Sequence, residues 1–134
     1  MKTSNADTWF SRYIRLRDAQ ESNGTLFVKC FTCGVIGHPK NMDNSHFMPR
    51  VHKSTRWDEV NCEPACIRCN WTLEGNKEVY AERLDAKHGA GTVDRLRIKA
   101  RTTAKIDPKM IAEYYKDKVN ALLTERGWTK LKWW

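Results

Sequence analysis

Two C-x-x-C pairs are the residues of this sequence best suited to hold a metal ion. Cys30 and Cys33 form the first pair, and Cys66 and Cys69 form the second. Four thiolates suit tetrahedral zinc, and each tight turn supplies two of them. Because paired spacings of this kind in a cytosolic chain indicate metal ligands rather than disulfides, we expect one structural zinc ion bound by these four cysteines. The fifth cysteine, Cys62, is expected to be a partly buried small apolar residue.

The segment between the two cysteine pairs is where chemistry is expected, because zinc held by four protein sulfurs has no open coordination position. It contains Asp43 and His46, while Asn61 precedes the second pair and Asn70 follows it directly. A carboxylate and an amide oxygen can hold Mg²⁺ or Mn²⁺. A histidine of near-neutral pKa can take a proton from an attacking water, and a second asparagine can hold its ring in orientation. Taken alone, His46 would more often be a surface or core histidine, and Asp43 would more often be a turn residue. The hypothesis of phosphodiester hydrolysis therefore rests on the order of these residues and the cysteine pairs along the chain.

The charge of the chain points to a polyanionic partner. Lys and Arg number 24 against 16 Asp and Glu, which gives a net charge of +8. A balance this basic favours nucleic acid as the partner. The sequence has no long apolar run and no signal-peptide pattern, so we expect a cytoplasmic protein that does not bind membranes. The basic residues expected to contact DNA phosphates follow His46 or lie on the first helix, and they are Arg50, Lys53, Arg56, Arg12 and Arg15.

The scaffold for these residues is predicted to be a single domain, as the length of 134 residues favours. Its predicted parts are an N-terminal helix (1–24), a zinc-stabilised core (25–76) and a helical C-terminal extension (77–134). The patterns predict strands at "TLFVKC", "SHFMPR" and "RWDEVN". They predict helices from Ser4 to about Glu21, from near Cys66 to Gly75, and at 77–88, 92–101 and 105–127. Asp107 is expected to cap the last of these helices.

Aromatic residues could add stacking contacts with unpaired bases. Trp57 and Trp71 lie near the cysteine pairs and are expected to pack in the core instead. Trp133 and Trp134 end the chain, where core packing is harder to justify, so they are available for DNA or for a partner subunit.

The order C-x-x-C, His, Asn, C-x-x-C-Asn resembles that of HNH (His-Me finger) endonucleases, in the zinc-stabilised variant whose last letter is Asn. More closely, the sequence resembles the NinG/Rap family of lambdoid phage recombination endonucleases. The stretches that carry this resemblance are "FSRYIRLRDAQ", "CFTCG", "DNSHF", "NCEPACIRCN" and "RLDAKHGAGTVDRL", and a more generic match continues into "IAEYYKDKVNALL".

The resemblance implies an α+β fold with a ββα-metal core around the pair of zinc knuckles, flanked by an N-terminal helix and a helical C-terminal part. It makes His46 the general base, Asn61 the residue that orients it, and Asn70 a ligand of a catalytic Mg²⁺ or Mn²⁺. Many members of the wider family have an acid directly before the histidine. Ser45 stands there in this sequence, so Asp43 is the nearest carboxylate for the metal.

The function implied is a metal-dependent, structure-selective DNA endonuclease. Its substrates would be branched recombination intermediates of phage or prophage DNA, such as Holliday junctions or D-loops, in the bacterial cytoplasm. Since resolving a junction needs two coordinated nicks, a homodimer is expected. A non-catalytic zinc-containing module that binds nucleic acid is the alternative. It explains the cysteines and the charge but leaves the order of His46, Asn61 and Asn70 to chance.

Overall fold

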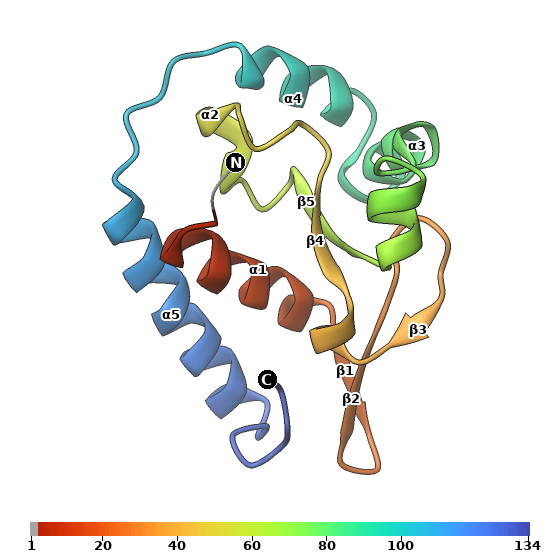
Figure 1. Ribbon diagram of the computed structural model, residues 1–134, viewed down its shortest axis with the longest axis vertical. Coiled ribbons are helices and arrows are strands. Elements are labelled where there is room, and N and C mark those ends of the chain that lie inside the picture. Colours follow the sequence, from red (N-terminus) through yellow and green to blue (C-terminus); the bar gives the residue numbers. More distant parts are fainter. Residues whose placement is uncertain (1–2) are drawn as a thin grey trace.

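The computed structural model describes residues 3–134 and has a mixed α+β fold (Figure 1). Its helices are α1 (Asn5–Arg17), α2 (Lys53–Arg56), α3 (Lys77–His88), α4 (Thr92–Ala100) and α5 (Pro108–Glu125), with a 3-10 turn η1 (Pro39–Asn41) and a π-helical turn η2 (Arg68–Thr72). Its strands are β1 (Gln20–Ser22), β2 (Thr25–Lys29), β3 (Ile36–Gly37), β4 (Asp43–His46) and β5 (Cys62–Ala65). Strands β1, β2 and β3 form one antiparallel sheet, and β4 pairs with β5 in a second.

Helix α1 begins where the sequence predicts and ends earlier. Ser4 caps it, since the Ser4 hydroxyl accepts from the Asp7 backbone N–H and the Asp7 carboxylate accepts from the Ser4 N–H. The predicted helix to Glu21 is wrong beyond Arg17, because the chain turns into the β1–β2 hairpin. Asn23 and Gly24 both take positive φ, of 52° and 81°. An Asn-Gly pair of this kind makes a two-residue hairpin turn rather than a helix end.

Helix α5 packs along α1, so the helical C-terminal part lies against the N-terminal helix (Figure 1). The ring of Phe10 meets that of Tyr115 edge-on, with centroids 4.8 Å apart. Helix α5 is shorter than the predicted range 105–127, but its predicted cap is confirmed: the Asp107 side chain accepts from a backbone N–H of the first turn, Pro108 opens the helix, and Gly127 follows its end with φ of 70°. No helix of the described residues is long and apolar enough to cross a membrane.

The β4–β5 hairpin carries most of the predicted chemistry and contains α2 in its connection. His46 lies opposite Cys62 in the register. The predicted strand over residues 56–61 is wrong, since turn hydrogen bonds from Asp58 N to Thr55 O and from Asn61 N to Asp58 O take the place of a ladder there. The predicted helix from Cys66 to Gly75 is likewise reduced to η2, because residues 74–76 all take positive φ and a right-handed helix cannot continue through them.

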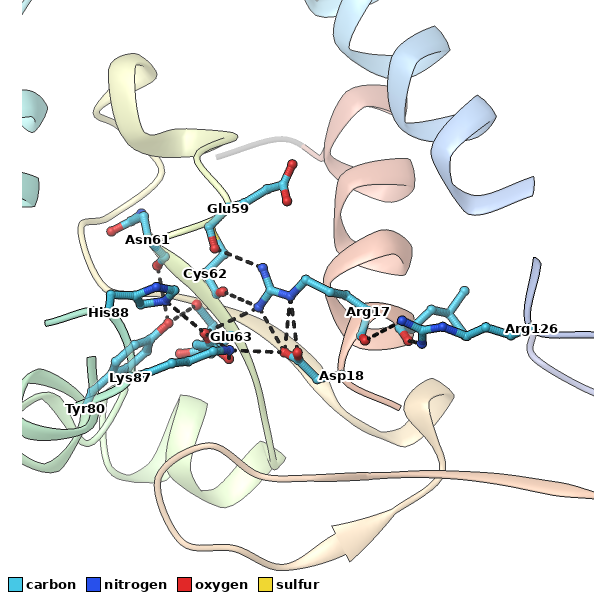
Figure 2. A network of polar contacts seen from close by, with 12 residues as sticks. Arg17, Asp18, Glu59, Asn61, Cys62, Glu63, Tyr80, Lys87, His88 and Arg126 are labelled. Atoms are coloured by element: carbon cyan, nitrogen blue, oxygen red, sulfur yellow. Dashed lines mark hydrogen bonds and ion pairs between the residues drawn. The ribbon is translucent and has the colours of Figure 1, made fainter. Parts of the chain in front are cut away.

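A buried ion-pair network fastens β5 to α1 and α3 (Figure 2). Glu63 of β5 is 1 % exposed and lies 2.8 Å from Lys87 Nζ and 3.3 Å from Arg17 Nη2. Arg17 also pairs with Asp18 and donates to the backbone carbonyls of Glu59 and of Cys62, the first residue of β5. Burial raises the pKa of Glu63 to about 7 in spite of both cations. The hairpin is therefore held in place by charges that come from three elements.

Candidate functional site

The four predicted zinc cysteines converge, although they come from two distant segments of the chain. The Sγ atoms of Cys30, Cys33, Cys66 and Cys69 all lie within 4.8 Å of one another. Cys33 Sγ and Cys66 Sγ are 3.7 Å apart. In a tetrahedral site with Zn–S bonds of 2.3 Å, two sulfurs are separated by roughly 3.8 Å. The cluster thus has the size and the ligand set of a zinc site.

The two tight turns that carry these thiols have the backbone bonds of zinc knuckles. Gly34 takes φ of 82° and donates its N–H to Cys30 O at 2.9 Å. In the second turn, Cys69 N–H points to Cys66 Sγ at 3.5 Å. The second of these bonds stabilises negative charge on the Cys66 thiolate. Cys62 lies outside the cluster and is fully buried, so it is a core residue, more buried than expected.

A cleft with a volume of about 640 Å³ opens beside β4, between α1 and η2. Asp43 and His46 reach it from β4, and Asn70 reaches it from η2, so three of the four residues of the predicted active site share one cleft. Its basic residues are Arg12, Arg15, Arg50 and Lys77, and Asp7, Asn44, Glu74, Trp71 and Trp134 are among the others that line it.

The His46 ring is held by a backbone carbonyl. Its Nε2 lies 2.8 Å from Arg56 O. A carbonyl can only accept, so Nε2 carries the hydrogen and the lone pair of the neutral ring is on Nδ1. Burial disfavours the imidazolium and lowers the pKa of His46 to about 4. At neutral pH the ring is therefore a free base.

Asn61 makes no hydrogen bond to the His46 ring, so its expected orienting role is not a direct one. Its side chain is completely buried and holds the connection between β4 and β5. Asn61 Oδ1 accepts from Met48 N–H at 2.7 Å, and Nδ2 donates to Met48 O and Thr55 O at 3.0 Å each. Thr55 precedes Arg56, whose carbonyl binds His46. Any effect of Asn61 on the ring therefore passes through the loop backbone.

Asp43 and Asn70 lie side by side, as the sequence hypothesis requires of two ligands of one cation. Asn70 Nδ2 donates to Asp43 Oδ2 at 3.1 Å, and Trp71 Nε1 donates to the same oxygen at 3.0 Å. These bonds fix the carboxylate through Oδ2, which leaves Asp43 Oδ1 and the Asn70 amide oxygen as the candidate ligand atoms for a cation. A carboxylate and an amide oxygen are ligands that Mg²⁺ and Mn²⁺ accept.

The predicted phosphate contacts divide into two groups. Arg12 and Arg15 line the cleft, where burial lowers the pKa of Arg15 to about 10, so it stays charged. Both guanidinium groups lie over the Trp134 ring, at 5.5 and 4.2 Å from its centroid, and Trp133 also packs against the core. Arg50 is half-buried at the cleft, and Lys53 is exposed on α2.

Arg56 is the exception, because its side chain points inward. It is buried, and its Nε donates to Asp7 Oδ1 at 2.9 Å. Burial alone would raise the pKa of Asp7, but bonds from Arg56 and Ser4 outweigh it and lower the pKa to about 2. The prediction that Arg56 contacts DNA is therefore wrong. Its guanidinium joins α2 to the first turn of α1 while its carbonyl holds His46.

Lys77 is a cleft residue that the sequence analysis missed. Its Nζ donates to His46 O at 2.6 Å and also to Phe47 O. Burial lowers its pKa to about 8. Lys77 stands at the start of α3, where nothing in the sequence distinguishes it from other surface lysines. The strained turn at residues 74–76 directs it back across the hairpin.

One family model matches almost the whole chain. Residues 3–125 match the family described as "Bacteriophage Lambda NinG protein". No curated protein and no solved structure matches.

Proposed function

The chain belongs to the NinG family, and from that premise we propose that it is a metal-dependent DNA endonuclease. Its proposed substrates are branched recombination intermediates of phage or prophage DNA, such as Holliday junctions or D-loops. In this proposal β4, β5 and η2 form an HNH-type ββα-metal core. The cysteine cluster holds a zinc ion that stabilises this core without taking part in the reaction.

The observation that carries the proposal is the state of His46 in the cleft. Its Nε2–H is engaged by Arg56 O, and burial keeps the ring neutral. The geometry suits a general base, because one ring nitrogen is bound to a carbonyl and the other carries a lone pair. The near-neutral pKa expected from the sequence is not found, since burial lowers the pKa of His46 to about 4 and makes the imidazole a weaker base. His46 also lines the same cleft as Asp43 and Asn70, the proposed ligands of the catalytic metal.

In the proposed step, a water oxygen attacks the phosphorus while His46 Nδ1 takes one of the water protons. The P–O bond to the leaving sugar breaks, and the leaving oxygen is protonated from solvent. General-base assistance of this kind typically contributes about 10²–10⁴-fold to rate. Lys77 Nζ holds the His46 backbone through its bond to His46 O, and Arg56 O holds the ring. Both the backbone and the ring of the proposed base are therefore fixed.

Asp43 and Asn70 would hold the catalytic Mg²⁺ or Mn²⁺. When bound there, the cation would stabilise the negative charge that develops on the phosphate and the leaving oxygen. The hydrogen bond between the two side chains supports this assignment, because it places a carboxylate and an amide group next to each other in the cleft. The phosphate backbone on either side would meet Arg12, Arg15 and Arg50, which bind without reading sequence.

A non-catalytic zinc module that binds nucleic acid is the second candidate, favoured by the cysteine cluster and the charge of +8. The two functions separate when zinc-loaded protein is incubated with labelled duplex, single strand, flap and four-way junction, with Mg²⁺ or Mn²⁺ either added or omitted. Omission is preferable to a chelator, which would also remove zinc. The endonuclease proposal expects cleavage only with added metal and most of it on branched DNA, whereas the module binds all four and cuts none.

A further inference from the structure

We propose that Trp71 is a stacking platform for an unpaired base next to the reacting phosphate. The inference deepens the proposed nuclease function, on which it rests for the position of that phosphate. It assigns to the site a substrate feature, an exposed base face, that neither the family match nor the metal chemistry specifies. Base–aromatic stacking tolerates every sequence, because each base has a π-face.

The first observation is that Trp71 has no packing role. Its side chain is 72 % exposed, the highest value among the exposed large hydrophobic residues of the described chain, and it belongs to no core cluster. This corrects the expectation that it packs like Trp57, which is buried. Burial of its ring therefore contributes almost nothing to the free energy of unfolding. Fold stability does not explain why a tryptophan, the largest side chain, occupies this position.

The second observation is that the exposed ring is held in one orientation. Trp71 Nε1 donates to Asp43 Oδ2, which also accepts from Asn70. The backbone beneath the ring is rigid as well, since Cys69 two residues earlier is fully buried in the cysteine cluster and its carbonyl accepts from Gly75 N–H. A ring that is already oriented loses less conformational entropy on binding than a free surface side chain.

The third observation concerns the residues that line the cleft together with the Trp71 ring. Trp71 lines the same cleft as His46, Arg12 and Arg15. Because Trp71 Nε1 is hydrogen-bonded to Asp43, the candidate metal ligand, the ring lies next to the phosphate that this ligand would serve. Paired bases are stacked inside a duplex and present only their edges, so the exposed face of Trp71 selects DNA whose bases are unpaired at the branch point.

A protein partner is the competing occupant of an exposed tryptophan. The charge favours nucleic acid, because the cleft beside the ring has four basic residues against the three acids Asp7, Asp43 and Glu74, and a chain of net charge +8 would repel a second copy of itself.

The test compares binding of two DNAs without added Mg²⁺ or Mn²⁺, so that cleavage does not interfere. One is a flap substrate with 2-aminopurine at the first unpaired position, and the other is the same sequence fully paired. Trp71→Ala should weaken binding of the flap on the order of 10- to 100-fold and leave duplex affinity unchanged. It should also abolish the quenching of 2-aminopurine seen with the wild type.

Two further variants make the result decisive. Trp71→Phe keeps a stacking ring and loses the bond to Asp43, so it should retain flap affinity to within a few fold. Tyr114→Ala removes another exposed aromatic, 53 % exposed on α5 and outside the cleft, and should behave as wild type. The proposal is overturned if Trp71→Ala weakens flap and duplex equally, if Trp71→Phe fails as badly as Trp71→Ala, or if only self-association changes. Because the readout is binding, these outcomes do not depend on whether His46 catalyses cleavage.

Discussion

The carbonyl of Arg56 accepts from His46 Nε2 at 2.8 Å, while the guanidinium of the same residue donates to Asp7 at 2.9 Å. Arg56 thus connects the first turn of α1 to the proposed general base. Trp57 also donates to Asp7, from Nε1 to Oδ1 at 3.0 Å. The position of the His46 ring therefore depends on the contacts that Arg56 and Trp57 make with Asp7.

Asn61→Ala should lower the rate of cleavage without removing any group from the cleft. The change leaves Met48 N–H and the carbonyls of Met48 and Thr55 without their buried partner, at a cost of about 1–3 kcal/mol for an unsatisfied group. The loop that presents Arg56 O would loosen. Thermal unfolding and single-turnover cleavage check this together, and a stable variant with full activity would refute the role of the loop.

Cys66→Ala should give protein that does not fold or that aggregates, because the binding energy of the zinc is part of the folding energy. Wild-type protein should contain one zinc per chain by elemental analysis. Cys62→Ala is the matched control, since Cys62 is buried outside the cluster, and this variant should fold and keep its zinc. Soluble, folded wild-type protein without metal would contradict the assignment.

Removing basic side chains should have two different effects according to their position. Arg50→Ala and Lys53→Ala should each weaken DNA binding at all sequences and reduce the salt slope by about one unit, if each contacts a phosphate. Arg56→Ala should instead lower the melting temperature, because it removes the nearer of the two cations that pair with the buried Asp7 carboxylate. Binding isotherms at several salt concentrations, beside melting curves, separate the two classes.

The pH dependence of the melting temperature should reflect the ionisation of the Glu63 carboxyl group. Its pKa rises from 4.5 to about 7 on folding, so between those values the folded chain holds a proton that the unfolded chain has lost. This contribution to stability is present below pH 4.5 and is lost as pH rises through 7. Melting temperatures of wild type and Glu63→Gln, both with excess zinc, should therefore diverge from pH 5 to 7.5, with wild type falling relative to the variant. Parallel curves would show that Glu63 stays ionised throughout.

The cysteine cluster and the shared cleft of Asp43, His46 and Asn70 could be predicted because both depend on residue type and order along the chain. The convergence of the four thiols needs only two turns with the right spacing. The side-chain roles of Arg56 and Asn61 could not be predicted, since the partner of Arg56 lies 49 positions away on α1 and that of Asn61 is loop backbone. "SNGT" carried the hairpin signal in its Asn-Gly pair, but the preceding helical pattern led to its interpretation as a helix end.

The central claim is that His46 is the general base. The most direct test is the single-turnover rate at which the zinc-loaded His46→Ala variant cuts a labelled branched DNA. This rate is measured across a titration of Mg²⁺ and of Mn²⁺. We predict a loss of about 10²–10⁴-fold at every metal concentration with DNA affinity unchanged, because a general base contributes to rate and little to ground-state binding. His52→Ala, which changes the nearby histidine before α2, should cut as wild type. Asn70→Ala should be partly rescued by high metal. If His46→Ala cuts as fast as wild type under every metal condition, the nuclease account is contradicted and the zinc-containing binding module replaces it.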